Sequence, residues 1–424
     1  MTPSITPNQT SSNGLLKWAL ILATAGFSFI CIVELINILF YDPYEDERFL
    51  FSFAESLMET EIETLTLLMF GTLALLLMAG LPMAFVVGGL GVVFIYLVGG
   101  QTMVNIIPTR IYPLMSNADL AAIPLFIFMA SMLEKAGLIE EMFDVVYKWM
   151  GGLNGGLAAA TILASTILAA MVGVIGAAVV TMGIIALPAM LKRNYDHKIA
   201  LGSIMAGGTL GILIPPSILA ILYAVIAQQS VGQLYLGSLV PGLMLSGMYI
   251  AYVLFRTLLN PKLGPALPRE ERVSFVQKLR LFRNLIAPIF LVFLVLGLLF
   301  GGIATPVEAA GIGSFGAIIV AIIHKRFSLQ ALRDASVTTA RASAMVLWII
   351  FGASIFVGFF ILEGGQDFIT ETILGTGLSP YGILLLMMFI LVFLGMFLDW
   401  VGILLLTVPI FIPVSYTHLR AHET

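Results

Sequence analysis

The sequence predicts an all-α, polytopic membrane protein with inverted repeats, two re-entrant hairpins and a discontinuous helix. Of its 424 residues, 60% are hydrophobic and 10% are charged, whereas soluble domains have roughly 45–50% apolar and about 25% charged residues. The mean hydropathy is +1.06. Apolar runs of bilayer-spanning length recur along almost the whole chain, and their continuity indicates helices rather than the alternating strands of a β-barrel.

The same composition excludes several other classes of protein. A net charge of −4 without a basic stripe gives no basis for nucleic-acid binding. The single cysteine, Cys31, rules out an internal disulfide and a cysteine-based metal site. The sequence contains no HExxH, GxSxG or P-loop motif, so we expect neither an enzyme nor a nucleotide-driven pump. Transport would then draw on an ion gradient, with no cofactor besides the coupling ion.

Residues 1–63 are expected to form a polar tail, an extra transmembrane helix and an acidic external segment. The helix covers Leu15–Phe40, which is too long for the core of a signal peptide. Tyr41–Glu63 carries many acidic residues and a single basic one, Arg48. Because Lys and Arg concentrate in cytoplasmic loops, this segment is assigned to the outside and the N-terminus to the cytoplasm.

Residues 64–255 are expected to form the first repeat. The apolar spans that precede its hairpin are Leu65–Ala79, Met83–Val98 and Ile123–Leu133. Leu138–Met150 interleaves charged and apolar residues, a pattern typical of a helix that lies in the membrane interface. This helix is not expected to span the membrane.

A first re-entrant hairpin follows. Two apolar pieces, Gly156–Ala170 and Ala177–Leu191, are short for membrane spans and flank a Gly-interrupted tip, Met171–Gly176. The second piece ends at Lys192 and Arg193, so the basic residues assign both ends of the pair to the cytoplasmic side. The chain is therefore predicted to enter the membrane and return on the same side.

The next run, Ile199–Ala227, has the length of a span but is interrupted. It contains Gly207 and Gly208, followed by the adjacent prolines Pro215 and Pro216. Prolines lack the backbone N–H that continues a helix. The sequence thus predicts a discontinuous helix.

The span Leu234–Phe255 closes the first repeat, and residues 256–284 form a basic loop that we assign to the cytoplasm. Residues 285–414 are expected to form the second repeat, with a hairpin tip at Gly395–Gly402. Its other predicted elements are, in order, Leu285–Phe300, Ala309–Ile323, Met345–Leu362, the amphipathic Phe368–Leu374, Tyr381–Leu394 and a last apolar piece that ends at Pro413.

The two hairpins match in spacing and oppose each other in orientation. Gly176 precedes Thr181 and Pro188 much as Gly402 precedes Thr407 and Pro413. By the count of spans, the first hairpin opens to the inside and the second to the outside. Inverted repeats with paired broken helices are typical of secondary transporters whose site lies near the membrane midplane. A chance match between two short Gly, Thr and Pro spacings is the alternative.

The broken helix supplies the first candidate site. Its three glycines allow close backbone approach, its two prolines free helical carbonyls, and its hydroxyls add oxygen ligands of the kind that sodium prefers. The candidate ion- or substrate-binding residues here are Gly207, Gly208, Thr209, Gly211, Pro215, Pro216 and Ser217. Of these, Gly207, Thr209, Pro215 and Ser217 are the candidate sodium ligands. A packing kink without a ligand is the alternative.

Other polar residues within the apolar regions have competing interpretations. Asp399 lies at the second hairpin tip, where a carboxylate is either functional or caps the following helix. Glu308 follows Thr305 in a capping-box pattern, which favours a structural role. Thr181 and Ser203 are expected to hydrogen-bond carbonyls of their own helices.

Four strings in this sequence resemble one family. They are ALPAMLKRNYD (Ala186–Asp196), GGTLGILIPPS (Gly207–Ser217), GGIATPVEAAGIG (Gly301–Gly313) and GMFLDWVGILLLTVPIF (Gly395–Phe411). They resemble the large membrane subunit of tripartite ATP-independent periplasmic (TRAP) transporters, of the C4-dicarboxylate type, over about residues 65–414.

The resemblance implies an elevator-type, sodium-driven carrier in the bacterial inner membrane. Such a permease takes up organic anions, such as C4-dicarboxylates or related carboxylic acids, from a periplasmic binding protein, and works with a small membrane subunit. Carried over by position, a first sodium site would lie between the first tip, at Gly173 and Gly176, and the broken helix. A second would use the other tip, with Asp399, Gly402 and Thr407. Val174 departs from the Ser- and Gly-rich first tip of much of the family.

The C-terminal end of the sequence differs from the rest. Residues 415–424 resemble translated adapter or vector sequence, and no second Pro-Pro-broken helix follows the second hairpin. We therefore expect a C-terminally truncated chain with an incomplete second repeat. Three other functions stay open at this point: a stand-alone sodium- or proton-coupled carboxylate carrier, a non-functional truncated remnant, and a channel or structural membrane protein.

Overall fold

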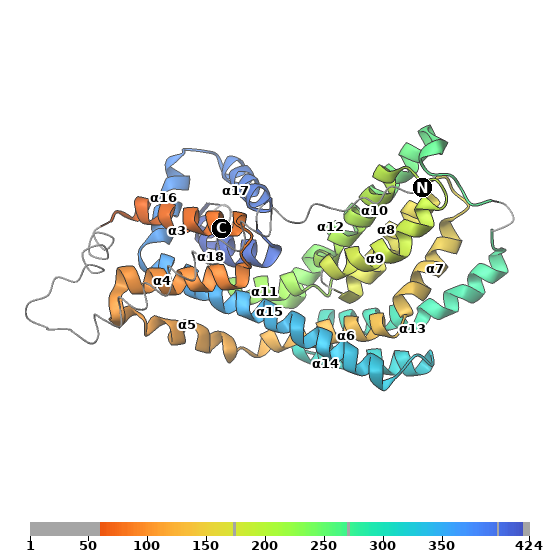
Figure 1. Ribbon diagram of the computed structural model, residues 1–424, viewed down its shortest axis with the longest axis horizontal. Coiled ribbons are helices and arrows are strands. Elements are labelled where there is room, and N and C mark those ends of the chain that lie inside the picture. Colours follow the sequence, from red (N-terminus) through yellow and green to blue (C-terminus); the bar gives the residue numbers. More distant parts are fainter. Residues whose placement is uncertain (1–59, 173–174, 269–271, 397, 419–424) are drawn as a thin grey trace, which may run out of the picture. The chain divides into compact units, whose positions relative to one another are not determined.

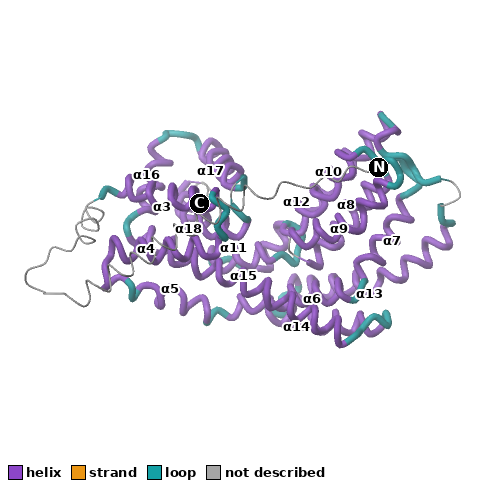
Figure 2. Tube along the Cα trace, viewed as in Figure 1, coloured by secondary structure: helices purple, strands orange, loops and turns teal. Residues whose placement is uncertain are grey.

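The computed structural model describes residues 60–172, 175–268, 272–396 and 398–418. All described helices belong to one unit, Ile62–Thr424. In this part of the chain the regular secondary structure is entirely helical (Figures 1 and 2). The predicted extra helix at Leu15–Phe40 lies outside the described residues.

The helices follow the predicted order closely. Their bounds are α3 (Ile62–Met78), α4 (Met83–Met103), α5 (Ile106–Met115), η1 (Ala118–Ala121), α6 (Ala122–Lys135), α7 (Leu138–Met150), α8 (Gly156–Val172), α9 (Ile175–Leu191), α10 (His197–Thr209), η2 (Leu210–Ile212), α11 (Ile218–Ala227), α12 (Val231–Leu259), η3 (Pro261–Leu263), α13 (Phe275–Phe300), α14 (Pro306–Ile323), α15 (Leu329–Leu362), α16 (Gly365–Gly375), α17 (Pro380–Leu394) and α18 (Trp400–His418).

The polytopic all-α prediction is confirmed. Among the described helices, four are long and apolar enough to cross a membrane singly, and two bent pairs would raise the number to six. The arms of both predicted hairpins are among the shorter apolar helices of 10–17 residues, as the short apolar pieces in the sequence predicted. The chain is a membrane-spanning protein.

Several helix boundaries differ from the sequence prediction. Both hairpin tips are shorter than expected, because α8 runs to Val172, α9 begins at Ile175 and α18 begins at Trp400. Gly176 and Gly402 therefore lie in first helical turns and not in loops. The helix expected at Met345–Leu362 begins at Leu329, since its first turns carry charged residues that hydropathy alone does not assign to a span.

Helix α15 is the central element of the packing and contacts α4, α5, α6, α16 and α18. It crosses α4 where two glycines meet: a Cβ atom added to Gly352 would lie 2.9 Å from the backbone N of Gly88. Small residues allow membrane helices to approach this closely. On the far side of α6, the Ser314 hydroxyl of α14 donates to the Leu125 carbonyl at 2.7 Å.

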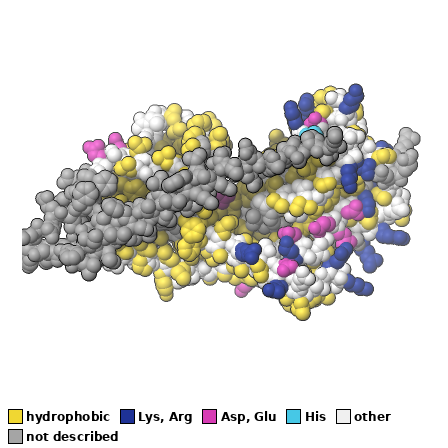
Figure 3. Space-filling view, in the orientation of Figure 1, with side chains coloured by type: hydrophobic (Ala, Val, Ile, Leu, Met, Phe, Trp, Pro, Cys, Tyr) yellow, Lys and Arg dark blue, Asp and Glu magenta, His cyan; other side chains and the backbone are white. Residues whose placement is uncertain are grey.

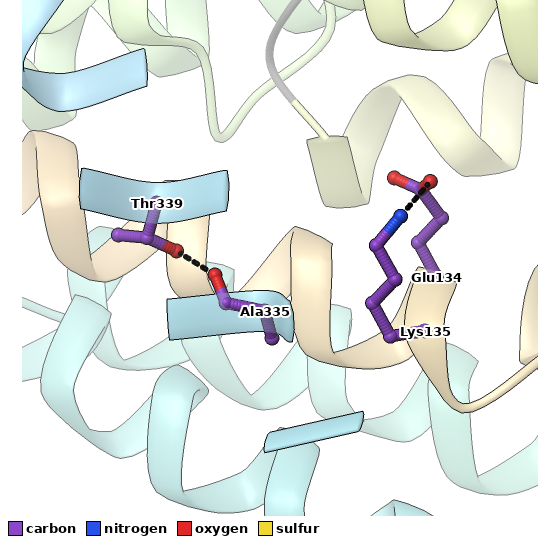
Figure 4. Close-up of polar contacts among 4 residues, drawn as sticks. All are labelled: Glu134, Lys135, Ala335 and Thr339. Carbon is purple, nitrogen blue, oxygen red and sulfur yellow. Dashed lines mark hydrogen bonds and ion pairs between the residues drawn. The ribbon is translucent and has the colours of Figure 1, made fainter. Parts of the chain in front are cut away.

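Figure 4 shows two polar contacts, one on α6 and one on α15. The buried Thr339 hydroxyl donates to the Ala335 carbonyl in its own helix at 2.8 Å. At the end of α6, Lys135 pairs with Glu134 at 3.2 Å. Ser343, which is also buried on α15, has a hydroxyl without a hydrogen-bond partner within the described residues.

Candidate transport site

One arm of the first hairpin, α8, is embedded in the protein, whereas the other arm, α9, exposes Val180 and Ile184. Helix α8 contacts α7, α9, α10 and α12, and most of its residues are buried. In Figure 1, α8, α9 and α10 lie side by side, as their contacts require. The Thr166 hydroxyl of α8 hydrogen-bonds the Ser246 hydroxyl of α12 at 2.6 Å, with both side chains buried. This bond fixes the hairpin to the helix behind it.

The base of the hairpin is held by the connections around it. The backbone N–H of Leu157 donates to the Tyr195 hydroxyl at 3.2 Å, and Thr257 donates to the Asn154 carbonyl at 3.0 Å. Burial raises the pKa of the Tyr195 hydroxyl to about 12, so this group stays neutral. The connection before α8, the one before α10 and the end of α12 are thereby tied together.

The predicted discontinuity in the next helix is confirmed. Helix α10 ends at Thr209, one turn of 3-10 helix follows, and α11 begins only at Ile218. The peptide bond between Pro215 and Pro216 is cis. Neither proline has a backbone N–H, so the carbonyls four residues earlier, at Gly211 and Ile212, lose their helical donors.

Part of this break is satisfied within the protein. The Ser217 hydroxyl donates to the Ile212 carbonyl at 2.5 Å, and the buried Tyr235 hydroxyl donates to the Ser217 carbonyl at 3.2 Å. Pro215, Pro216 and Ser217 are all buried. The predicted residues of the break are therefore collected in the protein interior, next to α12.

Two of the predicted glycines are required by close packing. A Cβ atom at Gly207 would lie 2.7 Å from Ser165 Oγ, and one at Gly208 would lie 2.2 Å from Val179 Cγ2. Both glycines are buried, and their α10 backbone lies directly against the two arms of the first hairpin. Close packing therefore requires glycine at these two positions.

Ser165 is a candidate that the sequence analysis missed. Its side chain is fully buried in α8, beside Gly207, and its hydroxyl has no hydrogen-bond partner within the described residues. A buried hydroxyl without a partner is unusual because its desolvation is uncompensated. No local motif marks this serine, since only the fold brings it to Gly207.

The remaining residues of the first site differ in exposure. Thr209 is exposed and donates its hydroxyl to the Ala206 carbonyl at 2.8 Å, whereas Gly211 is buried. Ser203 donates to the Ala200 carbonyl, so its predicted bond within its own helix is confirmed. Gly173 lies outside the described residues, and Gly176 is exposed in the first turn of α9.

The second hairpin meets the other half of the broken helix. Helix α18 contacts both α11 and α15. A cavity of about 700 Å³ lies between α11 and the hairpin, and Tyr223, Trp400 and Thr407 are among its lining residues. The Thr407 hydroxyl donates to the Ile403 carbonyl at 2.7 Å. Asp399 is exposed immediately before the first residue of α18.

The broken helix thus joins both hairpins. Its first half, with η2, packs against α8 and α9, and its second half packs against α18. Within the described residues, no group of three or more His, Cys, Asp or Glu side chains could hold a metal. The groups that the break offers are carbonyl and hydroxyl oxygens.

These features define a class of protein: a polytopic carrier whose interrupted helix lies between two hairpins, which is the architecture of secondary transporters. Residues 70–418 match the family described as tripartite ATP-independent periplasmic transporter, DctM component. The chain belongs to this family and is a TRAP transporter large permease, a transporter and not an enzyme.

Individual relatives agree with this assignment. The chain is 30% identical to a C4-dicarboxylate TRAP transporter large permease protein of Rhodobacter capsulatus, over 82% of this chain and 81% of that protein. It is 30% identical to an ectoine/5-hydroxyectoine TRAP transporter large permease protein of Ruegeria pomeroyi, over 81% and 80%. An isethionate TRAP transporter permease protein of Oleidesulfovibrio alaskensis is 29% identical, over 82% of this chain and 54% of that longer protein.

Proposed function

We propose that this chain is the permease of a sodium-coupled TRAP transporter that takes up organic anions across the bacterial inner membrane. The observation that carries the proposal is the broken helix, whose two halves pack against different hairpins. A movement of either hairpin would change the surroundings of the break. A ligand bound at the break would therefore affect the packing of both hairpins.

The substrate class is argued from the relatives. C4-dicarboxylates, ectoine and isethionate, which the names of three relatives contain, have in common a carboxylate or sulfonate group. An organic acid is therefore the proposed cargo. By the same family argument, its partners are a small membrane subunit and a periplasmic binding protein that delivers the substrate.

Sodium is proposed as the coupling ion because the break supplies oxygen ligands. The first proposed site uses Gly207, Thr209, Pro215 and Ser217, to which we add Ser165, whose hydroxyl has no partner among the described residues. The second uses the tip of the other hairpin, with Asp399 at its exposed end. Helix ends provide partial charges for ion and carboxylate binding without a buried formal charge.

The distribution of basic residues supports a cytoplasmic assignment for the base of the first hairpin. On the face shown in Figure 3, Lys and Arg side chains gather over the side where α7, α10, α12 and α13 lie. Lys148, Lys192 and Lys278 belong to these elements or their connections. Basic residues concentrate on the cytoplasmic side of membrane proteins, and the N-terminus is proposed to lie on the same side.

The experiment replaces both prolines of the break. The chain is reconstituted into proteoliposomes with the proposed partners, a small TRAP membrane subunit and a periplasmic binding protein, and uptake of a radiolabelled organic acid is measured with an inward sodium gradient. In Pro215→Ala/Pro216→Ala, restored helical donors should straighten the break. We expect sodium-dependent uptake to fall at least about tenfold, the rate ratio of a barrier raised by about 1.4 kcal/mol.

The matched control is Pro380→Ala, which changes a proline at the first position of α17, away from the break. It should retain wild-type uptake. Wild-type sodium-dependent uptake by the double variant would refute the site at the break. Uptake that proceeds equally without the binding protein would favour the stand-alone carrier instead, and equal rates with potassium in place of sodium would exclude sodium coupling.

A further inference from the structure

Arg110 lies on α5 with its side chain directed against α15. A Cβ atom added to Gly358 of α15 would come within 2.9 Å of Arg110 Nε, 3.1 Å of its Cδ and 3.3 Å of its Cγ. Any residue larger than glycine at position 358 would therefore displace the arginine. The arginine side chain thus crosses α15 at a glycine, where no α15 side chain obstructs it.

The guanidinium belongs to a small cavity bounded by four helices. The cavity has a volume of about 250 Å³ and lies between α5, α11, α15 and α18. Arg110 is its single charged lining residue, and Ser354 is the single other polar one among the described residues that line it. The rest of the wall is apolar, with Leu222, Val357 and Leu405 as examples.

The charge of Arg110 has no counterpart among the residues that the structure describes. The side chain is half-buried, and within the described part of the chain no hydrogen bond or ion pair engages its guanidinium. An arginine carries five N–H donors and stays charged at any physiological pH. A fixed cation beside an apolar cavity, with no protein acceptor, is suited to bind an anionic group from outside the protein.

We propose that this cavity is an anion subsite for an organic acid that carries one carboxylate or sulfonate on a short apolar body. Arg110 would bind the anionic group, and the walls of α11, α15 and α18 would enclose the rest. A dicarboxylate fits less well, because its second charge would meet an apolar wall without a second cation. The ligand class rests on the proposed function, in which organic acids are the cargo.

The size of the cavity agrees with a small ligand. At roughly 30 Å³ for each water molecule, the volume corresponds to about eight waters. The cavity also uses the same two helices as the larger cavity beside the second hairpin, on their opposite sides: Leu222 and Leu405 line the small one, whereas Tyr223 and Leu404 line the large one. A ligand at Arg110 thus touches both α11, the second half of the broken helix, and α18.

The test measures binding of two radiolabelled probes, 4-methylpentanoate and succinate, to the 424-residue chain in nanodiscs of zwitterionic lipid. Wild type is compared with Arg110→Gln, Arg110→Lys and Gly358→Ala, and with Arg341→Gln as the matched control. Arg341 is an exposed arginine of α15 that does not line the cavity. Size-exclusion profiles establish that each variant is folded.

We expect saturable binding of 4-methylpentanoate that is at least about tenfold weaker in Arg110→Gln, as for loss of a charged hydrogen bond. Arg110→Lys should retain part of the affinity. Gly358→Ala, which keeps the charge but displaces it, should weaken binding several-fold, and Arg341→Gln should not change it. Succinate should bind more weakly than 4-methylpentanoate.

Equal affinities of wild type and Arg110→Gln would overturn the subsite, and so would absence of 4-methylpentanoate binding by wild type. A tightly bound anionic lipid, detected by mass spectrometry in wild type and lost in Arg110→Gln, would overturn it in favour of a lipid headgroup. These outcomes are independent of sodium-driven uptake, which tests the proposed function. If 4-methylpentanoate binding depends on Arg110 but uptake does not depend on sodium, the subsite would be supported and sodium coupling would be refuted.

Discussion

The two hairpins share a sequence plan but are held by the protein in different ways. Both arms of the first one contact α10, and α8 is buried along most of its length, although α9 exposes Val180 and Ile184 at 60% and 71%. In the second, α18 is largely buried, whereas α17 exposes apolar side chains such as Tyr381, Phe389 and Val392 at 80%, 67% and 69%. The repeat in sequence thus specifies helix length and glycine position, but the neighbours of each arm decide how rigidly it is held.

The difference extends to the glycines that mark each hairpin site. Gly207 faces Ser165 and the backbone of Ile162, which belong to the rigid interior of α8. Gly402 faces the end of the Met83 side chain, whose Cε would lie 1.6 Å from an added Cβ atom. A methionine end can rotate away, but the middle of a buried helix cannot. We therefore expect substitutions at the two glycines to have unequal effects.

The largest effect is expected for Gly207→Ala. The added methyl group overlaps Ser165, so α8 and α10 have to separate, and overpacking of this kind costs about 1–3 kcal/mol. Thermal unfolding in detergent should detect the loss of stability, together with loss of uptake. Gly202→Ala is the matched control on the same helix, because nothing lies within 4 Å of a Cβ atom there. It should raise stability, since Ala favours a helix over Gly by about 1 kcal/mol.

Ser165→Gly should partly rescue Gly207→Ala, because it removes the Cβ atom that an added methyl would meet at 2.8 Å. Strictly additive effects of the two substitutions in a double-mutant cycle would show that this contact does not explain the destabilisation. They would also remove the main reason for regarding the first hairpin as the rigid one.

A second, smaller effect is expected for Thr166→Val. This substitution preserves the shape of the side chain but removes the hydrogen bond to Ser246 that attaches the first hairpin to α12. Hydrogen bonds between membrane helices contribute about 0.6–2 kcal/mol. The free energy of unfolding in detergent should fall by about 1 kcal/mol, whereas Thr72→Val, at a half-buried site whose hydroxyl bonds only carbonyls of its own helix, should leave it unchanged. If both variants lost the same free energy of unfolding, the hydrogen bond to α12 would not contribute to stability.

Local sequence patterns predicted the elements well, because they act over a few residues. The amphipathic helix was expected at Leu138–Met150 and has these bounds in the structure. The capping box is formed as expected: Thr305 N–H donates to Glu308 Oε2 at 2.8 Å, and Glu308 N–H donates to Thr305 Oγ1 at 3.3 Å. The break near Pro215 followed from the missing donors of proline alone.

The site could be predicted only in part, because its remaining features depend on contacts between distant segments. Ser165 becomes a candidate only when α8 is laid against Gly207. The pairing of Arg110 with Gly358 joins two helices far apart in the sequence, and neither residue belongs to a motif. The burial of single residues could not be predicted either: no local pattern indicates that Thr209 is exposed and Ser217 is buried.

The third prediction concerns the second hairpin. In Gly402→Ala the added methyl group displaces the end of Met83, and the helical preference of Ala offsets that repacking. The free energy of unfolding should change by less than about 0.5 kcal/mol. Gly402→Ala in a Met83→Ala background serves as the control, because the facing side chain is then short. A destabilisation as large as that of Gly207→Ala would abolish the proposed contrast between a rigid and an adaptable hairpin.

The smallest effect on stability is expected for Asp399→Asn, and here stability and transport should separate. The Asp399 side chain is exposed, and within the described residues no hydrogen bond or ion pair holds its carboxylate. Unfolding should therefore be unchanged, whereas sodium-dependent uptake should fall at least about tenfold if the carboxylate binds the ion. Asp119→Asn is the control, since Asp119 is exposed on η1, outside both hairpins. Wild-type uptake by Asp399→Asn would exclude a role of this carboxylate in ion binding, and the ion would then be held by backbone and hydroxyl oxygens at the first hairpin and the broken helix.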